Sequence, residues 1–233
     1  MFALGKVLRE IFYPTRCLSC HTTIAPSALL CLPCRESLLA QLFLNAGSRE
    51  CLHLDGIYIL FRYEDGVKKA LHGLKYHHRR SYLEQIAGEI QGQGIVAQLR
   101  DTWELCQAIF VVPIPTAPQR YKQRGYDIPS EIFCKWTSQE ELIWYPALAR
   151  NRDSLPQYGL NKLARRHNVQ HSLHVKRNVR GKVILLVDDI FTTGATMDEA
   201  GRVLKQAGAA AVYALAFAGN AGVTNNTKST ERG

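Results

Sequence analysis

The chain has 233 residues, of which 46% are apolar, with a formal net charge of +9 at pH 7 and a pI near 9.3. This length and apolar content allow one substantial domain with a buried core and a small appendage. No apolar run reaches the roughly 18 residues needed to span a bilayer, and the basic balance favours anionic partners, although an unspecific basic surface would have the same charge.

The N-terminal segment, residues 1–14 (MFALGKVLREIFYP), has the apolar spacing of one amphipathic helix. Its charged residues Lys6, Arg9 and Glu10 interrupt the continuous apolar stretch that a signal peptide requires. We therefore expect a soluble, cytoplasmic protein. Residues 36–44 (ESLLAQLFL) read as a short helix, and residues 45–50 (NAGSRE) as a linker.

Four of the seven cysteines lie close together in the N-terminal region, with the spacing C-x2-C-x10-C-x2-C. Each pair can bind one tetrahedral ion through two thiolates, and four sulfur ligands make a closed, structural site. Clustered cysteines in a chain without an export signal favour a metal over disulfides, and zinc is the expected ion. The predicted ligands are Cys17, Cys20, Cys31 and Cys34, with the adjacent His21 as a less favoured substitute.

From about residue 54 to 218, strand-like and helix-like segments alternate, which predicts an α/β fold with a parallel sheet covered on both faces. Gly92 and Gly94 weaken an otherwise long helical pattern at residues 82–99. Residues 219–233 are small and polar, and we expect them to be disordered. The expected strands are 56–63, 108–115, 182–187 and 210–218, and the expected helices are 66–77, 82–99, 129–139, 156–168 and 195–207.

The segment GKVILLVDDIFTTGATMDEAGRVL, residues 181–204, carries the clearest chemistry. Asp188 and Asp189 leave an apolar strand at its carboxyl end, where open α/β sheets bind ligands. A loop of small residues then leads into a helix, whose unpaired N–H groups and dipole favour a phosphate. A ribose 5-phosphate satisfies both, with its hydroxyls on the acids and its phosphate in the loop. The loop residues are Thr192, Thr193, Gly194, Ala195 and Thr196.

A second candidate segment follows the strand at residues 108–115. Pro113, Ile114 and Pro115 turn the chain, and a mobile-looking stretch with Arg120, Lys122 and Arg124 comes next. Basic side chains on a flexible loop can close over a pyrophosphate leaving group. An ordinary basic surface loop is the alternative.

The segment VILLVDDIFTTGAT resembles the 5-phosphoribosyl-1-pyrophosphate (PRPP) loop of type I phosphoribosyltransferases. Together with the CxxC pairs, LKY, VVPIP…RYKQRGY and R-NRDSLPQYGLNKLARRHN, it makes nearly the whole chain up to about residue 218 similar to the ComF family. The resemblance implies a zinc module at residues 1–50, a phosphoribosyltransferase-like domain at 51–218, and a link to DNA uptake in natural transformation. It also implies that Lys75 reaches a ligand phosphate, unless it is a solvated helix-end lysine.

One departure from the family pattern stands out. The family reads Arg-Gly-Phe-Asn-Gln where this chain has the residues 124–128, Arg-Gly-Tyr-Asp-Ile. The change adds a charge and removes amides, so the role of those amides is in doubt here. The downstream family positions are kept as Gln157, Leu160, Arg165 and Asn168.

Two other groups of residues have weaker signals. Three histidines near Lys75 suggest a second metal site or a nucleic-acid patch, with a basic, partly protonated helix end favoured over both. These are His72, His77 and His78. Cys51 shows no pairing pattern, and we expect Cys106 and Cys134 to be core residues.

Three functions remain open. The first is an enzyme that uses PRPP with Mg²⁺ and releases pyrophosphate, in which the two acids hold the ribose hydroxyls and stabilise charge developing on the sugar. The second is a PRPP or nucleotide-phosphate sensor without turnover. The third is a single-stranded DNA binding factor that uses the zinc module and the basic loops. The resemblance implies PRPP, single-stranded DNA and competence proteins as partners. The acceptor and the oligomeric state cannot be read from the sequence.

Overall fold

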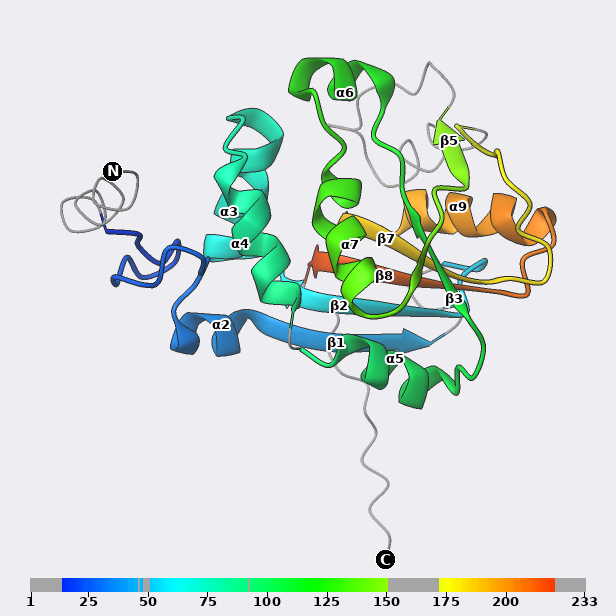
Figure 1. The fold of residues 1–233 in the computed structure, drawn as a ribbon, viewed down its shortest axis with the longest axis horizontal. Coiled ribbons are helices and arrows are strands. Elements are labelled where there is room, and N and C mark those ends of the chain that lie inside the picture. Colours follow the sequence, from blue (N-terminus) through cyan, green and yellow to red (C-terminus); the bar gives the residue numbers. More distant parts are fainter. Residues whose placement is uncertain (1–13, 46, 48–50, 92, 151–171, 221–233) are drawn as a thin grey trace, which may run out of the picture.

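A computed structural model describes residues 14–45, 47, 51–91, 93–150 and 172–220. Within these residues a six-stranded sheet has the order β1-β2-β8-β7-β3-β4 (Figure 1). Five of its strands run parallel, and β1 pairs antiparallel with β2 at one edge. The predicted α/β class is therefore confirmed, with a mixed rather than a purely parallel sheet.

The strands of this sheet are apolar runs, as expected for strands covered on both faces. In β7 the first five residues are all buried. The strand bounds are β1 Leu39–Asn45, β2 Gly56–Arg62, β3 Ile109–Pro113, β4 Ile143–Trp144, β7 Val183–Phe191 and β8 Ala211–Gly219. A separate antiparallel pair consists of β5 Leu148–Arg150 and β6 Leu173–Val175.

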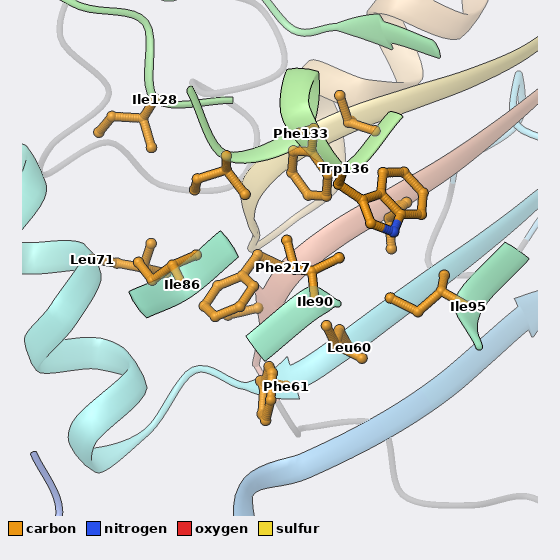
Figure 2. Packing of buried hydrophobic residues seen from close by; sticks show 14 of the residues in the cluster. Leu60, Phe61, Leu71, Ile86, Ile90, Ile95, Ile128, Phe133, Trp136 and Phe217 are labelled. Carbon is orange, nitrogen blue, oxygen red and sulfur yellow. The ribbon is translucent and has the colours of Figure 1, made fainter. Parts of the chain in front are cut away.

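Helices cover both faces of the sheet. On one face, aromatic and aliphatic side chains from α3, α4, α5 and α7 pack on β2 and β8 (Figure 2). On the other face, α9 and the β5–β6 pair pack over a second apolar cluster. The helix bounds are α2 Leu32–Leu38, α3 Asp65–Tyr76, α4 Ser81–Ile90, α5 Ile95–Trp103, α6 Pro118–Arg124, α7 Ile128–Gln139 and α9 Ala195–Gln206.

Two helix predictions are wrong. The run at residues 36–44 continues α2 only to Leu38, and the chain then forms β1, because its apolar side chains pair with β2 at the sheet edge. The sheet thus includes seven residues, Leu39–Asn45, that were expected in the N-terminal module. The long helix expected at 82–99 is two helices, α4 and α5, and Gly94 between them has a left-handed backbone with φ of 59°.

The remaining predictions for this part of the chain agree with the structure. Strands β2, β3, β7 and β8 and helices α3, α7 and α9 form where they were expected. In the part of the chain that is described, no helix is both long and apolar enough to cross a membrane. The predicted N-terminal helix, the helix at 156–168 and the C-terminal tail lie outside the described residues.

Candidate functional site

A cleft of about 450 Å³ lies where the parallel strands β3 and β7 end. The two strands reach the same edge because Pro113 pairs with Val187, so whatever follows each strand lies nearby. This is the edge at which open parallel sheets bind ligands. The cleft is lined by Tyr63, Lys75, Ile114–Arg120, Gln123, Arg124, Ile128, Pro129, Arg150 and residues 188–197.

The two acids lie within β7 rather than after it, since the strand continues to Phe191. Successive strand residues point to opposite faces of a sheet, so the two carboxyl groups meet different neighbours. Asp189 meets α3, where Lys75 Nζ lies 2.6 Å from Asp189 Oδ2. Asp188 interacts electrostatically with Arg150 of β5, and its Oδ1 accepts a 2.8 Å bond from the Asp189 backbone N–H.

These environments shift the pKa values of the two carboxyl groups in opposite directions. Burial, and then the neighbouring Asp189 charge, raise the pKa of Asp188 well above its usual value. Burial would also raise the pKa of Asp189, but the Lys75 ammonium, a hydrogen bond with Asp188 and the Arg124 charge together outweigh burial, so the pKa of Asp189 is lowered. Asp188 is therefore the harder of the two carboxyl groups to ionise, and Asp189 is the easier one.

The predicted phosphate loop joins β7 to α9, whose N-terminal cap residue is Gly194. The backbone of Gly194 is left-handed, with φ of 78°, and a Cβ there would lie 2.3 Å from Cys51 Sγ. Only glycine fits both the conformation and the space. The side chain of Thr193 accepts a 3.4 Å bond from the Ala195 N–H, and α9 then begins with its dipole directed at the cleft.

The predicted pyrophosphate segment is helical rather than a mobile loop, because residues 118–124 form α6 with Pro118 in its first turn. Arg120 and Arg124 line the cleft, whereas Lys122 is exposed and lies outside it. Arg124 Nε donates a 2.9 Å bond to the Lys75 carbonyl, and burial lowers the pKa of Arg124. Pro113 is the buried last residue of β3 and does not line the cleft.

Sequence reasoning missed several lining residues, among them Arg150 and Tyr63. Arg150 comes from β5 and donates through Nε to the Pro115 carbonyl at 3.0 Å, and burial lowers the pKa of Arg150. A three-residue strand outside the main sheet gives no periodic signal, so only the tertiary fold brings it to the cleft. Tyr63 follows β2 directly. The same argument from strand ends that found the acids applies to Tyr63.

The residues that depart from the family pattern have defined roles here. Tyr126 is buried, and its hydroxyl donates a 2.8 Å bond to the Leu74 carbonyl of α3. Asp127 caps α7, since Oδ2 accepts bonds from the Ser130 N–H and hydroxyl, and Oδ1 accepts one from the Thr116 N–H at 2.9 Å. Ile128 is buried at the cleft floor. The aspartate therefore uses both oxygens.

The four predicted cysteine ligands come together in the structure. Their sulfur atoms all lie within 4.8 Å of one another, which suits one ion held by four thiolates. Bonds from Thr22 lower the pKa of Cys20 to about 6, while the neighbouring Cys31 raises that of Cys34 to about 12. Four thiolates this close need a cation to balance them, so the cluster can hold a metal ion such as zinc.

The other singled-out residues lie apart from this cluster and from the cleft. Cys51 is buried under Gly194, but Cys106 and Cys134 are exposed, so their predicted place in the core is wrong. His72, His77 and His78 are exposed at the end of α3, and no histidine joins a candidate metal cluster within the described residues. Gln157, Leu160, Arg165 and Asn168 lie outside the described residues.

Comparison with known proteins agrees with the chemistry of this cleft. The family called Phosphoribosyl transferase domain matches residues 150–229. The DNA utilization protein YhgH of Escherichia coli K12 is 25% identical over 158 residues, which cover 64% of this chain and 66% of that protein. The chain thus spans just under two thirds of the length of these relatives.

Two further proteins resemble parts of the chain. A ribose-phosphate pyrophosphokinase from Synechococcus elongatus is 40% identical over 70 residues, 30% of this chain and 21% of that protein. The solved structure of a glutamine PRPP amidotransferase from B. subtilis, in complex with ADP and GMP, has a TM-score of 0.39 and 17% identity, covering 63% of this chain and 30% of that one.

Proposed function

Because the chain belongs to the ComF family and carries a phosphoribosyltransferase domain, we propose that its cleft binds PRPP together with Mg²⁺. One observation carries the proposal: an acid pair, a glycine-capped helix start and several cationic side chains from other elements surround the same 450 Å³ cleft. A ribose that bears a 5-phosphate and a 1-pyrophosphate has hydroxyls for the acid pair and anionic groups for the helix start and the cationic side chains.

Each part of the ligand has a counterpart. Asp188 and Asp189 take the ribose hydroxyls or the Mg²⁺ ion, for which carboxylate oxygens are preferred ligands. Residues 192–196 take the 5-phosphate at the start of α9. Lys75, Arg120, Arg124 and Arg150 all line the cleft and take the pyrophosphate. The guanidinium groups suit phosphate oxygens because they present paired donors.

Reaction at this site would transfer the ribosyl phosphate to an acceptor and release pyrophosphate. The acid pair would stabilise positive charge that develops on the sugar, and the cationic side chains would stabilise the leaving group. The two acids differ in how readily they ionise, since the pKa of Asp188 is raised by burial and the pKa of Asp189 is lowered mainly by Lys75. Binding without turnover, as in a sensor, needs the same residues, so the two functions separate only by assay.

The binding proposal is tested by isothermal titration of PRPP with Mg²⁺. We expect the wild type to bind and the Asp188→Asn/Asp189→Asn double variant to lose at least tenfold in affinity, about 1.4 kcal/mol. Asp101→Asn is the matched control, because Asp101 is exposed on α5 and does not line the cleft. Equal affinity in all three proteins would refute a phosphoribosyl site.

Pyrophosphate release, screened over purine and pyrimidine bases and single-stranded DNA, then separates an enzyme from a sensor.

A DNA-related role is the second part of the proposal. Relatives named DNA utilization proteins support it, as does the basic composition of α3 and the residues after it, since residues 66–80 contain Lys68, Lys69, Lys75, Arg79 and Arg80 and no acid. Cationic surfaces bind nucleic-acid backbones with an affinity that falls steeply with salt. We expect single-stranded DNA binding with such a salt dependence. A flat response from 50 to 200 mM salt would count against backbone contacts.

We also propose that the cysteine cluster holds Zn²⁺ in a structural role, since four sulfur ligands leave no open position for a substrate. Elemental analysis of protein purified without chelator is expected to give one zinc per chain. A Cys17→Ser/Cys20→Ser variant should lose it, whereas Cys106→Ser should keep it, because Cys106 is exposed and outside the cluster.

A further inference from the structure

Helix α3 contacts the cysteine cluster at one end and the cleft at the other. Its first turn holds Gly66, and its last turn holds Lys75. At a rise of 1.5 Å per residue these positions are about 14 Å apart along the helix axis. A single rigid element therefore joins a candidate metal site to a candidate ligand site, and hydrogen bonds or ion pairs hold both of its ends.

The first turn of α3 is held by Leu18 and Ser19, the two residues between Cys17 and Cys20, which we call the knuckle. Ser19 Oγ accepts a 3.1 Å bond from the Gly66 N–H, and Lys69 Nζ donates a 2.9 Å bond to the Leu18 carbonyl. The N-cap residue of α3 makes no side-chain bond of its own, so Ser19 satisfies a helix donor that would otherwise be unpaired.

The fit between the knuckle and α3 is close. A Cβ on Gly66 would lie 2.7 Å from Ser19 Oγ and 2.6 Å from Leu30 Cδ2. Glycine is required here because the two backbones approach so closely. A shift of the knuckle is therefore transmitted to the start of α3, since little free space separates them.

The last turn of α3 is held just as firmly in the cleft. Lys75 pairs with Asp189 at 2.6 Å, and the carbonyl groups of Leu74 and Lys75 accept bonds from Tyr126 and Arg124. The position of this turn thus sets where the Lys75 ammonium lies relative to the acid pair.

We propose that the knuckle positions Lys75 through α3, so that metal in the cysteine cluster and phosphoribosyl ligand in the cleft strengthen each other's binding. The inference rests on the proposed PRPP site. Metal fixes the knuckle because Cys17 and Cys20, which flank it, are both ligands. Coupling of this kind passes through packed, rigid elements and is reciprocal. Loss of the metal frees the knuckle, and α3 then loses its first-turn contacts.

A second set of contacts makes the inference testable without detaching the cluster. Segment 26–35 is also tied to α4, through a Gln85 bond to the Pro26 carbonyl at 3.1 Å and an Arg35–Glu89 ion pair at 2.9 Å. Removing the contacts to α3 therefore leaves the metal module anchored. Removing the Gln85 contact to α4 gives a control that perturbs the same module without touching α3.

The experiment measures the zinc affinity of the full chain by competition with a chromophoric chelator, with and without saturating PRPP and Mg²⁺. We expect PRPP to raise the apparent zinc affinity of the wild type about fivefold or more. In Ser19→Ala/Lys69→Met the increase should disappear while zinc stoichiometry and the circular dichroism spectrum stay unchanged. In Gln85→Ala it should remain. Chelation of zinc by PRPP itself is the same in every sample that contains PRPP, and a protein-free titration of the chelator in the same PRPP and Mg²⁺ corrects for it.

The outcomes separate this inference from the proposed function. If PRPP binds by titration but leaves the zinc affinity of the wild type unchanged, the coupling is refuted and the ligand site stands. An increase that persists in Ser19→Ala/Lys69→Met equally refutes the path through α3. If that double variant does not fold, the single variant Lys69→Met replaces it. We then expect PRPP to raise the zinc affinity of Lys69→Met by less than it raises that of the wild type. Failure of PRPP to bind at all would overturn both proposals.

Discussion

Lys75 Nζ lies 2.6 Å from Asp189 Oδ2, and both side chains are largely buried, with exposed fractions of 18% and 10%. This ion pair joins the last turn of α3 to β7 in the cleft. The ammonium thus balances part of the negative charge of the acid pair. Two adjacent carboxyl groups with no cation beside them would strongly disfavour the charged form of one another.

The ion pair predicts a pH-dependent stability loss in Lys75→Met. Removing one partner leaves a buried charge uncompensated, which costs roughly 3 kcal/mol at neutral pH. The lowered pKa of Asp189 contributes stability that is present above the usual aspartate pKa and lost as pH falls through its folded value. Wild type and variant should therefore converge only as pH falls below the usual aspartate pKa, as measured by urea unfolding between pH 2 and 7. Lys68→Met, exposed on the same helix, is the control; a loss independent of pH would argue against an electrostatic cause.

Asp188→Asn should stabilise the protein while weakening ligand binding. The raised pKa of Asp188 means that its ionised form is disfavoured in the fold, so a cost appears as pH rises through that pKa. Asparagine removes the charge and keeps the oxygen that accepts from the Asp189 N–H. We expect the variant to melt at a higher temperature than the wild type at pH 8, by about 2–4 °C for each kcal/mol by which its free energy of unfolding rises. At pH 4 the two melting temperatures should be the same. A lower melting temperature at pH 8 would contradict the assigned pKa direction.

Gly194→Ala is expected to lower the free energy of unfolding by at least about 3 kcal/mol and to abolish PRPP binding. The left-handed backbone alone costs about 1 kcal/mol with a side chain, and the added Cβ would also overlap Cys51 Sγ and Phe191, with 2.3 and 2.8 Å separations. Gly125→Ala separates the two effects, since Gly125 has a similar φ of 79° with no atom within 4 Å of its Cβ position. Equal losses in both variants, measured by chemical denaturation, would show that crowding under the loop is unimportant.

Asp127→Asn, which brings in the residue typical of the family pattern, should destabilise this chain by about 1 kcal/mol. The two carboxylate oxygens of Asp127 accept hydrogen bonds from three donors. In asparagine an NH2 group replaces one of these oxygens, so a donor would lie against a donor on that side. Thermal unfolding measures the loss. Glu131→Gln on the same helix is the control, because Glu131 is exposed. An unchanged melting temperature would mean that the local structure adapts to the amide.

Part of the fold and site followed from short stretches of sequence. The acid pair, the glycine at the loop and the four cysteines could be identified because each depends on neighbours close in the chain: an apolar strand with its exit turn, or two CxxC pairs. Strand ends of parallel sheets meet at one edge, so the predicted acids and the segment after β3 were expected together, and both line the cleft.

Other features depended on packing partners far away in the chain. Residues 39–45 have apolar spacing that suits a helix or a strand, and the free edge of β2 made them a strand. Cys106 and Cys134 were expected in the core on composition alone, yet their segments expose them. Arg150 and the contact of Ser19 with Gly66 could not be foreseen, because each joins elements whose relative placement no local pattern encodes.

The sequence by itself therefore determined the chemistry available to this protein: two carboxylates after a buried strand, a small-residue loop and a cysteine cluster, all set by local spacing. Only the tertiary structure decided how these parts connect. Burial beside Lys75 made the two adjacent acids unequal, and the packing of α3 between the knuckle and the cleft joined the cysteine cluster to them. Desolvation and long-range contacts arise only when distant segments meet, and no local pattern specifies which of them do.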